Sequence, residues 1–514
     1  MSTRLSSHAR AVACGFALCA VSAGVGVRAG ALAKATPRAM AEQIAVAPYA
    51  ASARQAPDRS RPPVPGPVPS LTLPPIERRT LPNGLAVWLI ERHDVPIVDV
   101  TVIIRAGADA DPAGRDGLAS FTAAMLDEGA GGRDAVALAD AAARAGATIT
   151  ADATFDATTV HLHVLASRLD AALPILADEI LRPGFAPDAI ERVRQDRLTG
   201  LLQTRDNSAA LAEAALSRFI FGAAHRYGTP IAGTRAATTA ITAPDLRRFY
   251  GAHYRAGLAT VLVAGDVTAS TLVPELERAF GAWARGTAAR SPAPAAPSRT
   301  SAPATRRIYL IDAPGASQSQ IRMGAMGAAR RAPDAAAIDV LNTILGGPFT
   351  SRLNQNLREA HGYAYRASSA FVMRRGAGPF EAGGAVKGDK TAEALGEFFK
   401  EIDRLHDAAV PAEELARARN MEALSFPAAF ETTAGLSSQV APLAIYDLPE
   451  SRLRDYVASI EAVSADDVQA AARRYLDSSR FVTVVVGDLA RIEAPIRAAH
   501  LGDVQVVTAD DVLN

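Results

Sequence analysis

The strongest constraint on the fold is a repeat that divides the sequence into two similar halves. Each half closes with a helical stretch that opens on an acidic residue, followed by an apolar run that ends in Gly-Asp. The helical stretch opens near Asp245 in the first half and near Asp467 in the second, and the apolar runs end at Gly265 and Gly487. Both pairs are 222 positions apart. A period this long indicates two duplicated domains and not a solenoid of short repeats.

Two stretches without helix or strand periodicity flank the expected folded parts. Residues 36–75 are rich in Ala, Pro and Arg, and residues 285–305 form a second Pro- and Ala-rich run. Such composition is typical of an extended linker. We therefore expect a first domain at residues 76–284 and a second at residues 306–514, which also suits a chain too long for one core.

Residues 1–35 have the pattern of an export signal. Arg4 and Arg10 precede a short apolar run, and small-residue cleavage sites follow near Ala33. The run is weakly apolar for a bilayer-spanning helix, which is the alternative. We expect an exported, periplasmic protein with no transmembrane segment in the mature chain.

Both cysteines, Cys14 and Cys19, lie inside the expected signal. The mature chain would then have no disulfide, no thiolate metal site and no cysteine nucleophile. Lipidation of one of them is an open alternative, although Phe16-Ala17-Leu18 places a bulky residue before Cys19 where a lipoprotein signal has a small one, and Cys14 precedes most of the apolar run.

The composition is that of an ordinary globular protein, with 49% hydrophobic and 21% charged residues. Lys plus Arg and Asp plus Glu both number 54, so the formal net charge is zero. Because no basic excess or stripe is present, we expect no nucleic-acid partner.

The first half mixes strands with helices. The turn Asn83-Gly84 predicts a β-hairpin that leads into a strand. Alternation and apolar runs predict strands at 86–90, 97–105, 147–151 and 158–165. Helical periodicity predicts helices at 117–126, 134–145, 170–180 and 187–205. The predicted class is α+β: two homologous α/β sandwich domains, each a mainly antiparallel sheet with helices on one face.

The order of several short motifs resembles the M16 family of metallopeptidases, which includes insulinase-, pitrilysin- and mitochondrial-processing-peptidase-like members. The resemblance covers nearly all of the chain after residue 75. Its motifs are Leu81-Pro82-Asn83-Gly84-Leu85, Gly117-Leu118-Ala119, Pro314-Gly315-Ala316-Ser317-Gln318, and the segment from Ser351 to Tyr365. Individually these motifs are weak, and their order across a duplicated chain makes the match specific.

Active members of that family carry His-x-x-Glu-His on the first helix. The two histidines hold zinc from one helical face, the Glu activates water, and a further Glu about 76 residues on is the third ligand. Here Ser120, Ala123 and Ala124 stand at the three motif positions, and the third ligand falls near Gly200 or Leu201. Since alanine, glycine and leucine have no donor side chain, the resemblance implies a degenerate site that binds no metal.

Two other groups offer weaker metal signals. Asp127 and Glu128 follow the first helix but have no His partner, and a solvated helix end explains them. His161 and His163 share one face of a predicted strand and so suit chelation, but no third ligand is visible. A polar strand face is the simpler explanation of the histidine pair.

The second half retains residues that the resemblance associates with catalysis. Arg358 and Tyr365 match an Arg and a Tyr that assist the zinc centre of the opposing domain, and these side chains suit holding a peptide carbonyl or oxyanion. The alternative is a surface ion pair for Arg358 and a core position for Tyr365. Gly346 and Gly347 match the family's glycine-rich loop, which is associated with substrate binding, although a plain turn is equally compatible.

The resemblance therefore implies the non-catalytic subunit of a divided peptidase. Its partner would be an M16-type subunit with an intact His-x-x-Glu-His, which would hold the zinc, so that this chain binds no cofactor itself. Substrates would be unfolded peptides that add a strand to a sheet edge. The alternatives are a purely structural or binding protein with the same fold, and a self-sufficient protease whose site the sequence does not reveal.

Overall fold

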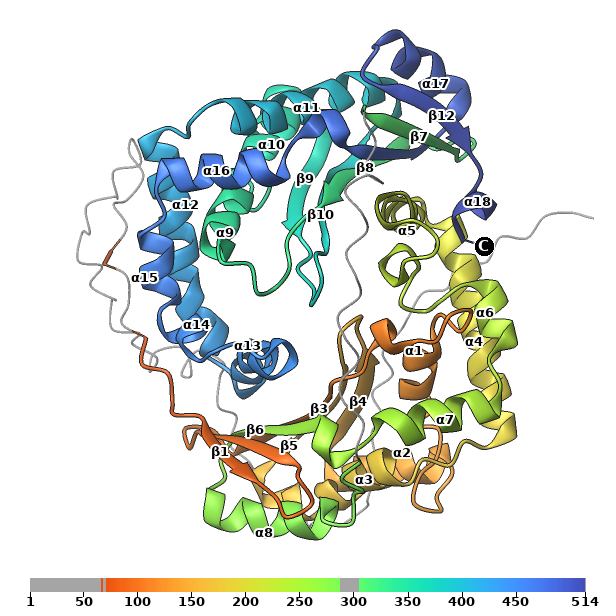
Figure 1. Ribbon diagram of the computed structural model, residues 1–514, viewed down its shortest axis with the longest axis vertical. Coiled ribbons are helices and arrows are strands. Elements are labelled where there is room, and N and C mark those ends of the chain that lie inside the picture. Colours follow the sequence, from red (N-terminus) through yellow and green to blue (C-terminus); the bar gives the residue numbers. More distant parts are fainter. Residues whose placement is uncertain (1–65, 68–70, 287–304, 514) are drawn as a thin grey trace, which may run out of the picture. The chain divides into compact units, whose positions relative to one another are not determined.

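Two six-stranded sheets organise the chain (Figure 1). The structure is a computed structural model, and the residues that it describes are 66–67, 71–286 and 305–513. These residues belong to one compact unit. The predicted signal at residues 1–35 and most of the linker residues at 36–75 and 285–305 lie outside the described residues.

The first sheet has the strand order β1-β2-β6-β3-β5-β4. Its strands are β1 Glu77–Thr80, β2 Ala86–Glu91, β3 Ile97–Ile104, β4 Thr148–Ala153, β5 Thr158–Leu165 and β6 Ala259–Gly265. Only β2 and β6 run parallel among the pairs in this sheet. The predicted hairpin joins β1 to β2, and Gly84 adopts a left-handed φ of 88° in its turn.

The second sheet has the order β12-β7-β11-β8-β10-β9. Its strands are β7 Arg307–Asp312, β8 Gln318–Met326, β9 Ala364–Phe371, β10 Pro379–Lys387, β11 Val482–Gly487 and β12 Asp503–Val507. Strand β7 runs parallel to both of its neighbours, and the other pairs are antiparallel. The prediction of mainly antiparallel sheets in two similar α+β domains is confirmed.

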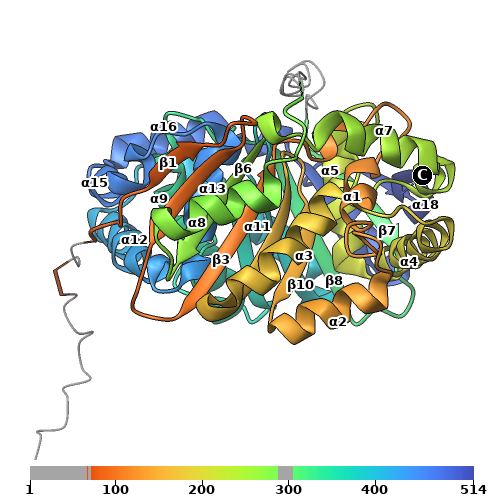
Figure 2. The ribbon, with the colours of Figure 1, turned by 90° about the horizontal axis from the view of Figure 1, so that it is seen from below.

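Helices cover one face of each sheet. Those of the first half are α1 Leu118–Ala123, α2 Ala135–Ala145, α3 Leu169–Leu181, α4 Pro187–Asp206, α5 Ser208–Phe221, α6 Arg235–Ala240, α7 Ala243–His253 and α8 Ala269–Phe280. Leucines of α3 and α8 join the core beneath the first sheet, and Figure 2 shows these two helices lying across it.

The helices of the second half repeat this order. They are α9 Ala335–Leu345, α10 Arg352–Asn354, α11 Thr391–Asp407, α12 Ala412–Ser425, α13 Thr433–Tyr446, α14 Ser451–Arg454, α15 Tyr456–Glu461, α16 Ala465–Tyr475, α17 Leu489–Ala498 and α18 Ala509–Leu513. Short 3-10 helices lie at Ala108–Ala110, Ala166–Arg168, Arg226–Gly228, Ala256–Leu258, Gly388–Lys390, Phe426–Phe430 and Ser478–Arg480, and a π-helical turn, η6, lies at Gln355–Ala360. Within the described ranges, no helix combines the length and apolarity that crossing a bilayer requires.

The duplication is visible in local detail. Helices α7 and α16 occupy the same place in each half, directly before the central strands β6 and β11. Both begin with a capping box, formed by Thr242 with Asp245 in α7 and by Ser464 with Asp467 in α16. In each box the hydroxyl accepts a hydrogen bond from the backbone N–H of the acidic residue, and the carboxylate accepts one from the backbone N–H of the cap residue. These two bonds fix the start of the helix.

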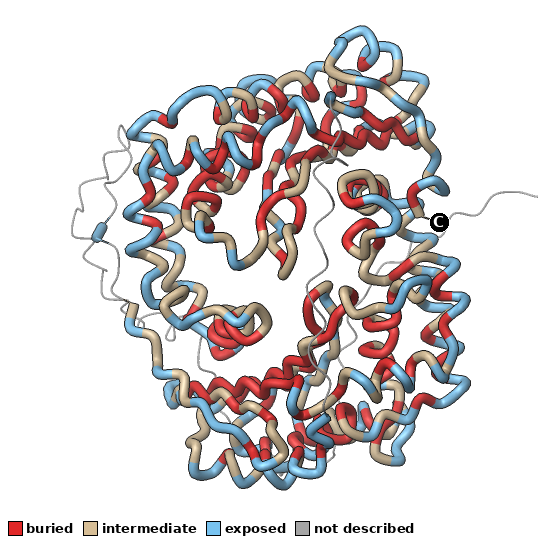
Figure 3. The backbone as a smooth tube through the Cα atoms, viewed as in Figure 1, coloured by how far each residue is buried: buried red, intermediate tan, exposed pale blue. Residues whose placement is uncertain are grey.

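The opposite face of each sheet is covered in part by one helix from the other half. Leu211 and Leu216 of α5 pack with Val484 of the second sheet, and Leu436 and Val440 of α13 pack against the first sheet. Strands β6 and β11 are accordingly buried at every position, as Figure 3 also shows. This exchange of helices between the halves could not be predicted from the sequence, because an apolar run does not say which segment covers it.

Candidate functional site

Helix α1 carries the three positions at which the resemblance places the zinc motif. It is shorter than the predicted helix at residues 117–126, because only Leu118–Ala123 is α-helical. The next turn tightens into 3-10 bonds, from Met125 N to Thr122 O and from Leu126 N to Ala123 O. Ala123 is buried, and Ala124 ends the α-helical part as its C-cap.

Ser120, at the position of the first histidine, is committed to structural hydrogen bonds. Its Oγ lies 3.1 Å from the carbonyl oxygen of Gly117 and 3.0 Å from that of Ile231. Either carbonyl accepts the single hydroxyl proton. The same Oγ accepts a hydrogen bond from the guanidinium of Arg197 at 3.0 Å.

Arg197, on α4, places its guanidinium against the degenerate motif. Its Nη2 donates to Ser120 and to the carbonyl oxygens of Gly117, at 3.0 Å, and Ala232, at 2.7 Å. The guanidinium also lies over the ring of Phe121, 4.9 Å from its centroid. Burial lowers the pKa of Arg197 to about 10, so the side chain remains a cation at neutral pH. A fixed positive charge therefore occupies the contact between α1 and α4.

The expected third-ligand positions offer no donor. Gly200 lies on α4 one turn beyond Arg197, and a Cβ there would meet nothing within 4 Å. Leu201 lines a cavity of about 620 Å³ together with Leu198 and Leu202. Neither position presents a polar side chain to α1.

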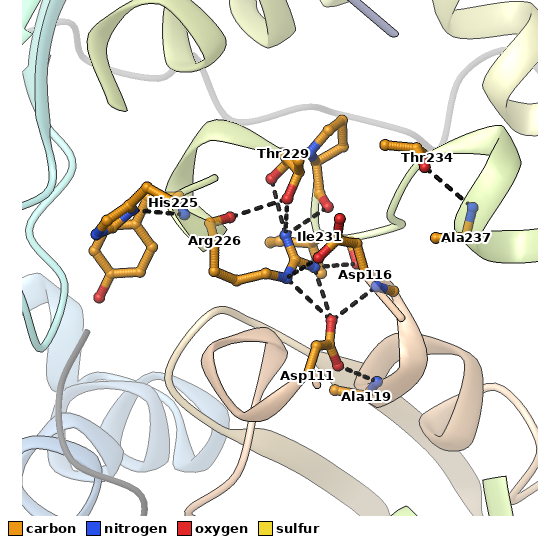
Figure 4. Close-up of polar contacts among 12 residues, drawn as sticks. Asp111, Asp116, Ala119, His225, Arg226, Thr229, Ile231, Thr234 and Ala237 are labelled. Atoms are coloured by element: carbon orange, nitrogen blue, oxygen red, sulfur yellow. Dashed lines mark hydrogen bonds and ion pairs between the residues drawn. The ribbon is translucent and has the colours of Figure 1, made fainter. Parts of the chain in front are cut away.

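A buried ion pair holds the start of α1 in place (Figure 4). The carboxylate of Asp111 accepts from the backbone N–H groups of Gly117 and Ala119, each at 2.7 Å, and from Arg226 Nη2 at 3.0 Å. Burial raises the pKa of Asp111, and these donors oppose the rise. Arg226 also donates to the carbonyl oxygens of Thr229, Pro230 and Ile231. The network joins the helix start to the loop that receives Ser120.

Zinc does not fit these residues. Ser120 is the only motif position with a side-chain oxygen, and the Arg197 cation beside it opposes a divalent cation. Across the described ranges, no three side chains of His, Cys, Asp or Glu are arranged as metal ligands.

His161 and His163 lie on one face of β5, as their spacing predicted, and both contact Asp99 on β3. His161 Nε2 is 3.1 Å and His163 Nδ1 is 2.9 Å from Asp99 Oδ1. Burial favours the neutral carboxyl of Asp99, but hydrogen bonds from His161, Thr433 and His163 outweigh it and lower the pKa of Asp99. The pair thus supports a buried carboxylate, in keeping with the polar-strand explanation.

The structure brings Arg358 and Tyr365 together at the surface of the second half. Arg358 lies on η6 and Tyr365 on β9, and the guanidinium carbon is 5.3 Å from the centre of the Tyr365 ring. It is also 4.4 Å from the ring of Phe349, which packs edge-to-face against Tyr365 with 6.4 Å between the ring centres. Tyr365 is 77% exposed and Phe349 47% exposed, so neither is a core residue. Arg358 also pairs with Glu359 at 3.3 Å.

We call these three side chains the aromatic clamp: Phe349, Arg358 and Tyr365. Contact with two aromatic rings restrains the guanidinium while leaving N–H groups at its edge for a ligand. Within the residues that the structure describes, the Tyr365 hydroxyl makes no hydrogen bond. The clamp can therefore donate to an external carbonyl or carboxylate oxygen. Sequence reasoning missed Phe349, although it directly follows the glycine-rich Gly346-Gly347-Pro348 segment.

Gly346 and Gly347 follow α9 and make close packing contacts. A Cβ on Gly346 would lie 2.3 Å from the backbone nitrogen of Ser369, and one on Gly347 would lie 3.0 Å from Thr343 Cα. Gly346 also accepts a hydrogen bond from Ser369 N at 3.2 Å. These contacts require small residues for packing, and a role in substrate binding stays a prediction.

Comparison with known proteins places the chain in one family. Residues 86–234 match the model of insulinase (peptidase family M16), and residues 240–422 match the peptidase M16 inactive domain. The chain belongs to the peptidase M16 family. The family resemblance inferred from sequence is confirmed.

Individual relatives agree with this assignment. An uncharacterized zinc protease of Streptomyces coelicolor is 26% identical over 413 residues, covering 80% of this chain and 89% of the relative. A non-peptidase homologue of Helicobacter pylori is 25% identical over 280 residues, covering 54% of this chain and 62% of the homologue. The crystal structure of a peptidase M16 inactive domain from Pseudomonas fluorescens superimposes with a TM-score of 0.73 at 25% identity, covering 80% of this chain and 98% of that one.

Proposed function

We propose that this chain is the non-catalytic subunit of an exported M16-type peptidase pair. The observation that supports the proposal is a contrast between two sites. At the metal-motif face of α1 lies the buried Arg197 of α4, and no set of metal ligands is present there. The aromatic clamp in the second half is instead exposed and has N–H and O–H donors free for a ligand.

In this proposal the partner is an M16-type subunit with an intact His-x-x-Glu-His, which supplies the zinc, the base and the water. This chain would supply Arg358 and Tyr365, which donate hydrogen bonds to the peptide carbonyl oxygen as negative charge develops on it. Such donors contribute most where water is excluded, between two closed subunits.

The position of Tyr365 is compatible with an extended peptide as substrate. Strand β9 is the last strand of the second sheet, so one of its edges has no strand partner. An unfolded peptide can pair with such an edge through main-chain hydrogen bonds, which do not depend on its sequence. Export to the periplasm is proposed from residues 1–35 alone.

The test is to co-purify the chain with its partner and to measure cleavage of a quenched fluorescent peptide. We expect Arg358→Ala to lower kcat/KM of the pair about 100-fold and Tyr365→Phe about tenfold. Arg366→Ala is the matched control, because Arg366 is an exposed neighbour on β9 without an ion pair among the described residues. If both clamp variants turn over peptide at the wild-type rate, the proposed catalytic contribution is wrong.

A purely structural or binding role is the second candidate. The non-peptidase homologue of Helicobacter pylori favours it, as does the Arg358–Glu359 ion pair, which gives Arg358 an internal partner. The clamp variants, each assayed together with the partner, separate the two candidates. A structural role predicts that the clamp variants support the same turnover as the wild-type chain, whereas the proposed role predicts that they reduce it.

A further inference from the structure

Two pairs of adjacent arginines lie next to each other in the second half. Arg330 and Arg331 precede α9, and Arg374 and Arg375 lie in the loop between β9 and β10. The backbone N–H of Arg330 donates to the carbonyl oxygen of Arg374 at 2.7 Å, and a β-bridge joins Ala329 to Arg374. The two pairs therefore belong to neighbouring loops, and their side chains can be compared directly.

The pair Arg374 and Arg375 is used within the chain. The guanidinium of Arg374 lies 3.9 Å from the ring centre of Phe155 and 4.6 Å from that of Tyr227, both in the first half. Arg375 forms an ion pair with Asp109. These contacts connect the second half to the first, so this pair has no capacity for an external ligand.

The pair Arg330 and Arg331 instead lines a cavity of about 430 Å³. Arg452 of α14 lines the same cavity, together with Ser451 and Ser459. Over the described ranges of the chain, none of these three arginines has a side-chain ion pair or hydrogen bond. Three cations thus line one cavity, and none has an ion pair or side-chain hydrogen bond within the described part of the chain.

Acidic groups near this cavity are already engaged. Asp455, the acidic residue among those that line the cavity, forms an ion pair with Arg454 at 3.1 Å. Behind the lining, Asp339 of α9 and Glu422 of α12 both accept from the hydroxyl of Tyr456, at 3.4 and 3.1 Å. Their charge attracts the arginines but lies beyond ion-pair distance of them, so the guanidinium donors stay available to a ligand.

We propose that this cavity, the arginine pocket, binds an acidic stretch of an extended peptide. Arginine presents paired N–H donors that match a carboxylate. The remaining lining includes Pro333, Leu448 and Pro449, whose apolar surface suits the aliphatic part of a peptide better than a free phosphate ion. The volume also falls in the usual range of ligand sites, roughly 300–1,000 Å³. The inference rests on the proposed function for its biological meaning, since it names acidic peptides as the substrate class.

The test measures fluorescence anisotropy of a labelled Asp-Ser peptide with the isolated full chain, with an Asn-Ser peptide of the same length as the neutral probe. We expect the chain to bind the Asp-Ser peptide and not the Asn-Ser peptide. The double variant Arg330→Gln/Arg452→Gln should weaken this affinity at least tenfold, and the exposed single variant Arg331→Gln should weaken it about threefold. Arg473→Gln, an exposed arginine of α16 without an ion pair among the described residues, should leave the affinity unchanged.

Several outcomes would overturn the arginine pocket. They are equal affinity for the Asn-Ser peptide, wild-type affinity in both arginine variants, and calorimetric binding of inorganic phosphate without binding of the Asp-Ser peptide. If circular dichroism shows that the double variant is unfolded, the affinity of the single Arg331→Gln variant for the Asp-Ser peptide decides between the outcomes. This binding assay needs neither the partner subunit nor peptide turnover. A negative result would therefore refute the arginine pocket without refuting the proposed role of Arg358 and Tyr365, and a negative result for those two residues would leave the arginine pocket standing.

Discussion

The two halves of the chain place equivalent helices against each other but line the contact with opposite charges. In the first half, α4 directs the Arg197 cation to the Ser120 hydroxyl on α1. In the second half, α12 directs the Glu422 carboxylate to the Thr343 hydroxyl on α9. Five of the six strands follow the same order in both sheets, from β2 to β4 and from β7 to β9, so the shared fold does not require either charge.

The contrast shows that the same pair of helices can be joined by a cation or by an anion. Each half satisfies its buried hydroxyl with one charged side chain from the facing helix, and each charge is supported by further hydrogen bonds. The accessible chemistry lies elsewhere, at the clamp surface of the second half. Experiments that alter the first contact therefore test structure, whereas those on the clamp test function.

The largest expected effect comes from rebuilding a metal site in the first half. Ser120→His, Ala123→Glu, Ala124→His and Gly200→Glu together restore the ligand types, but the Arg197 cation remains beside them. We expect zinc affinity to rise more than 100-fold when Arg197→Ala is added, because a guanidinium and Zn²⁺ repel strongly at short range. Zinc per chain after dialysis, measured by mass spectrometry, checks this. One zinc per chain already in the four-residue variant would contradict it.

Removing the first-half cation alone should destabilise the chain. Arg197→Ala leaves the carbonyl oxygens of Gly117 and Ala232 without their charged donor, and we expect the free energy of unfolding to fall by about 3 kcal/mol. Arg192→Ala is the matched control on the same helix, because Arg192 is half-exposed and pairs only with Glu128. Its loss should lower the free energy of unfolding far less than Arg197→Ala does in urea denaturation, because an exposed ion pair contributes little. Equal losses for the two variants would mean that Arg197 has no special structural role.

A buried carboxyl in the first half should make stability depend on pH. Glu179 on α3 is 3% exposed, and burial, with repulsion from Asp127, raises its pKa from 4.5 to about 8. Because the folded pKa is the higher one, the neutral carboxyl stabilises the fold at low pH. This contribution is lost as pH rises from 4.5 to about 8. Glu179→Gln should remove a decline of roughly 3 kcal/mol across that window, measured by chemical denaturation.

The second half should show the same behaviour in a lower window. Burial, with repulsion from Glu422, raises the pKa of Asp339 from 3.8 to about 6. Stability from this group is therefore lost between pH 3.8 and about 6, and Asp339→Asn should flatten that part of the profile in chemical denaturation. The exposed Glu461→Gln is the control for both variants. A profile of either variant parallel to the wild type would show that its carboxyl is not the titrating group.

The smallest effect tests whether the duplicated helices are equivalent in energy. Thr242→Ala and Ser464→Ala each remove the side chain of a capping box, at the starts of α7 and α16. We expect each to lower the free energy of unfolding by about 1 kcal/mol, with no difference between the halves. Melting temperatures of both variants provide the measurement, and a clear inequality would show that the halves have diverged here.

Much of the fold follows from sequence, because its elements have strong periods and clear boundaries. The helix expected from Pro187 to Arg205 is found at Pro187–Asp206, and the strand at 158–165 is found with the same bounds. Asn83-Gly84 fixed the first hairpin. Helix α1 was overestimated, because its α-helical bonds give way to a 3-10 turn that periodicity does not distinguish from a continuing helix.

The candidate site was predictable only where it is local. Arg358 and Tyr365 are seven residues apart, so a single motif located both. The contact of Arg197 with Ser120 spans 77 positions and depends on how α4 lies against α1, which no spacing rule supplies. Phe349 was missed because an isolated aromatic residue after a glycine-rich segment carries no periodic signal.

The exchange of α5 and α13 has a consequence for how the chain can be made. The strands of the first sheet are complete once Gly265 has been added, yet the helix that covers their second face ends at Tyr446. Until then Ile103 and Leu262 face solvent, so the first half cannot finish its core by itself. Any nascent or truncated chain that stops before α13 should therefore be a substrate for chaperones, and the two halves should fold as one piece.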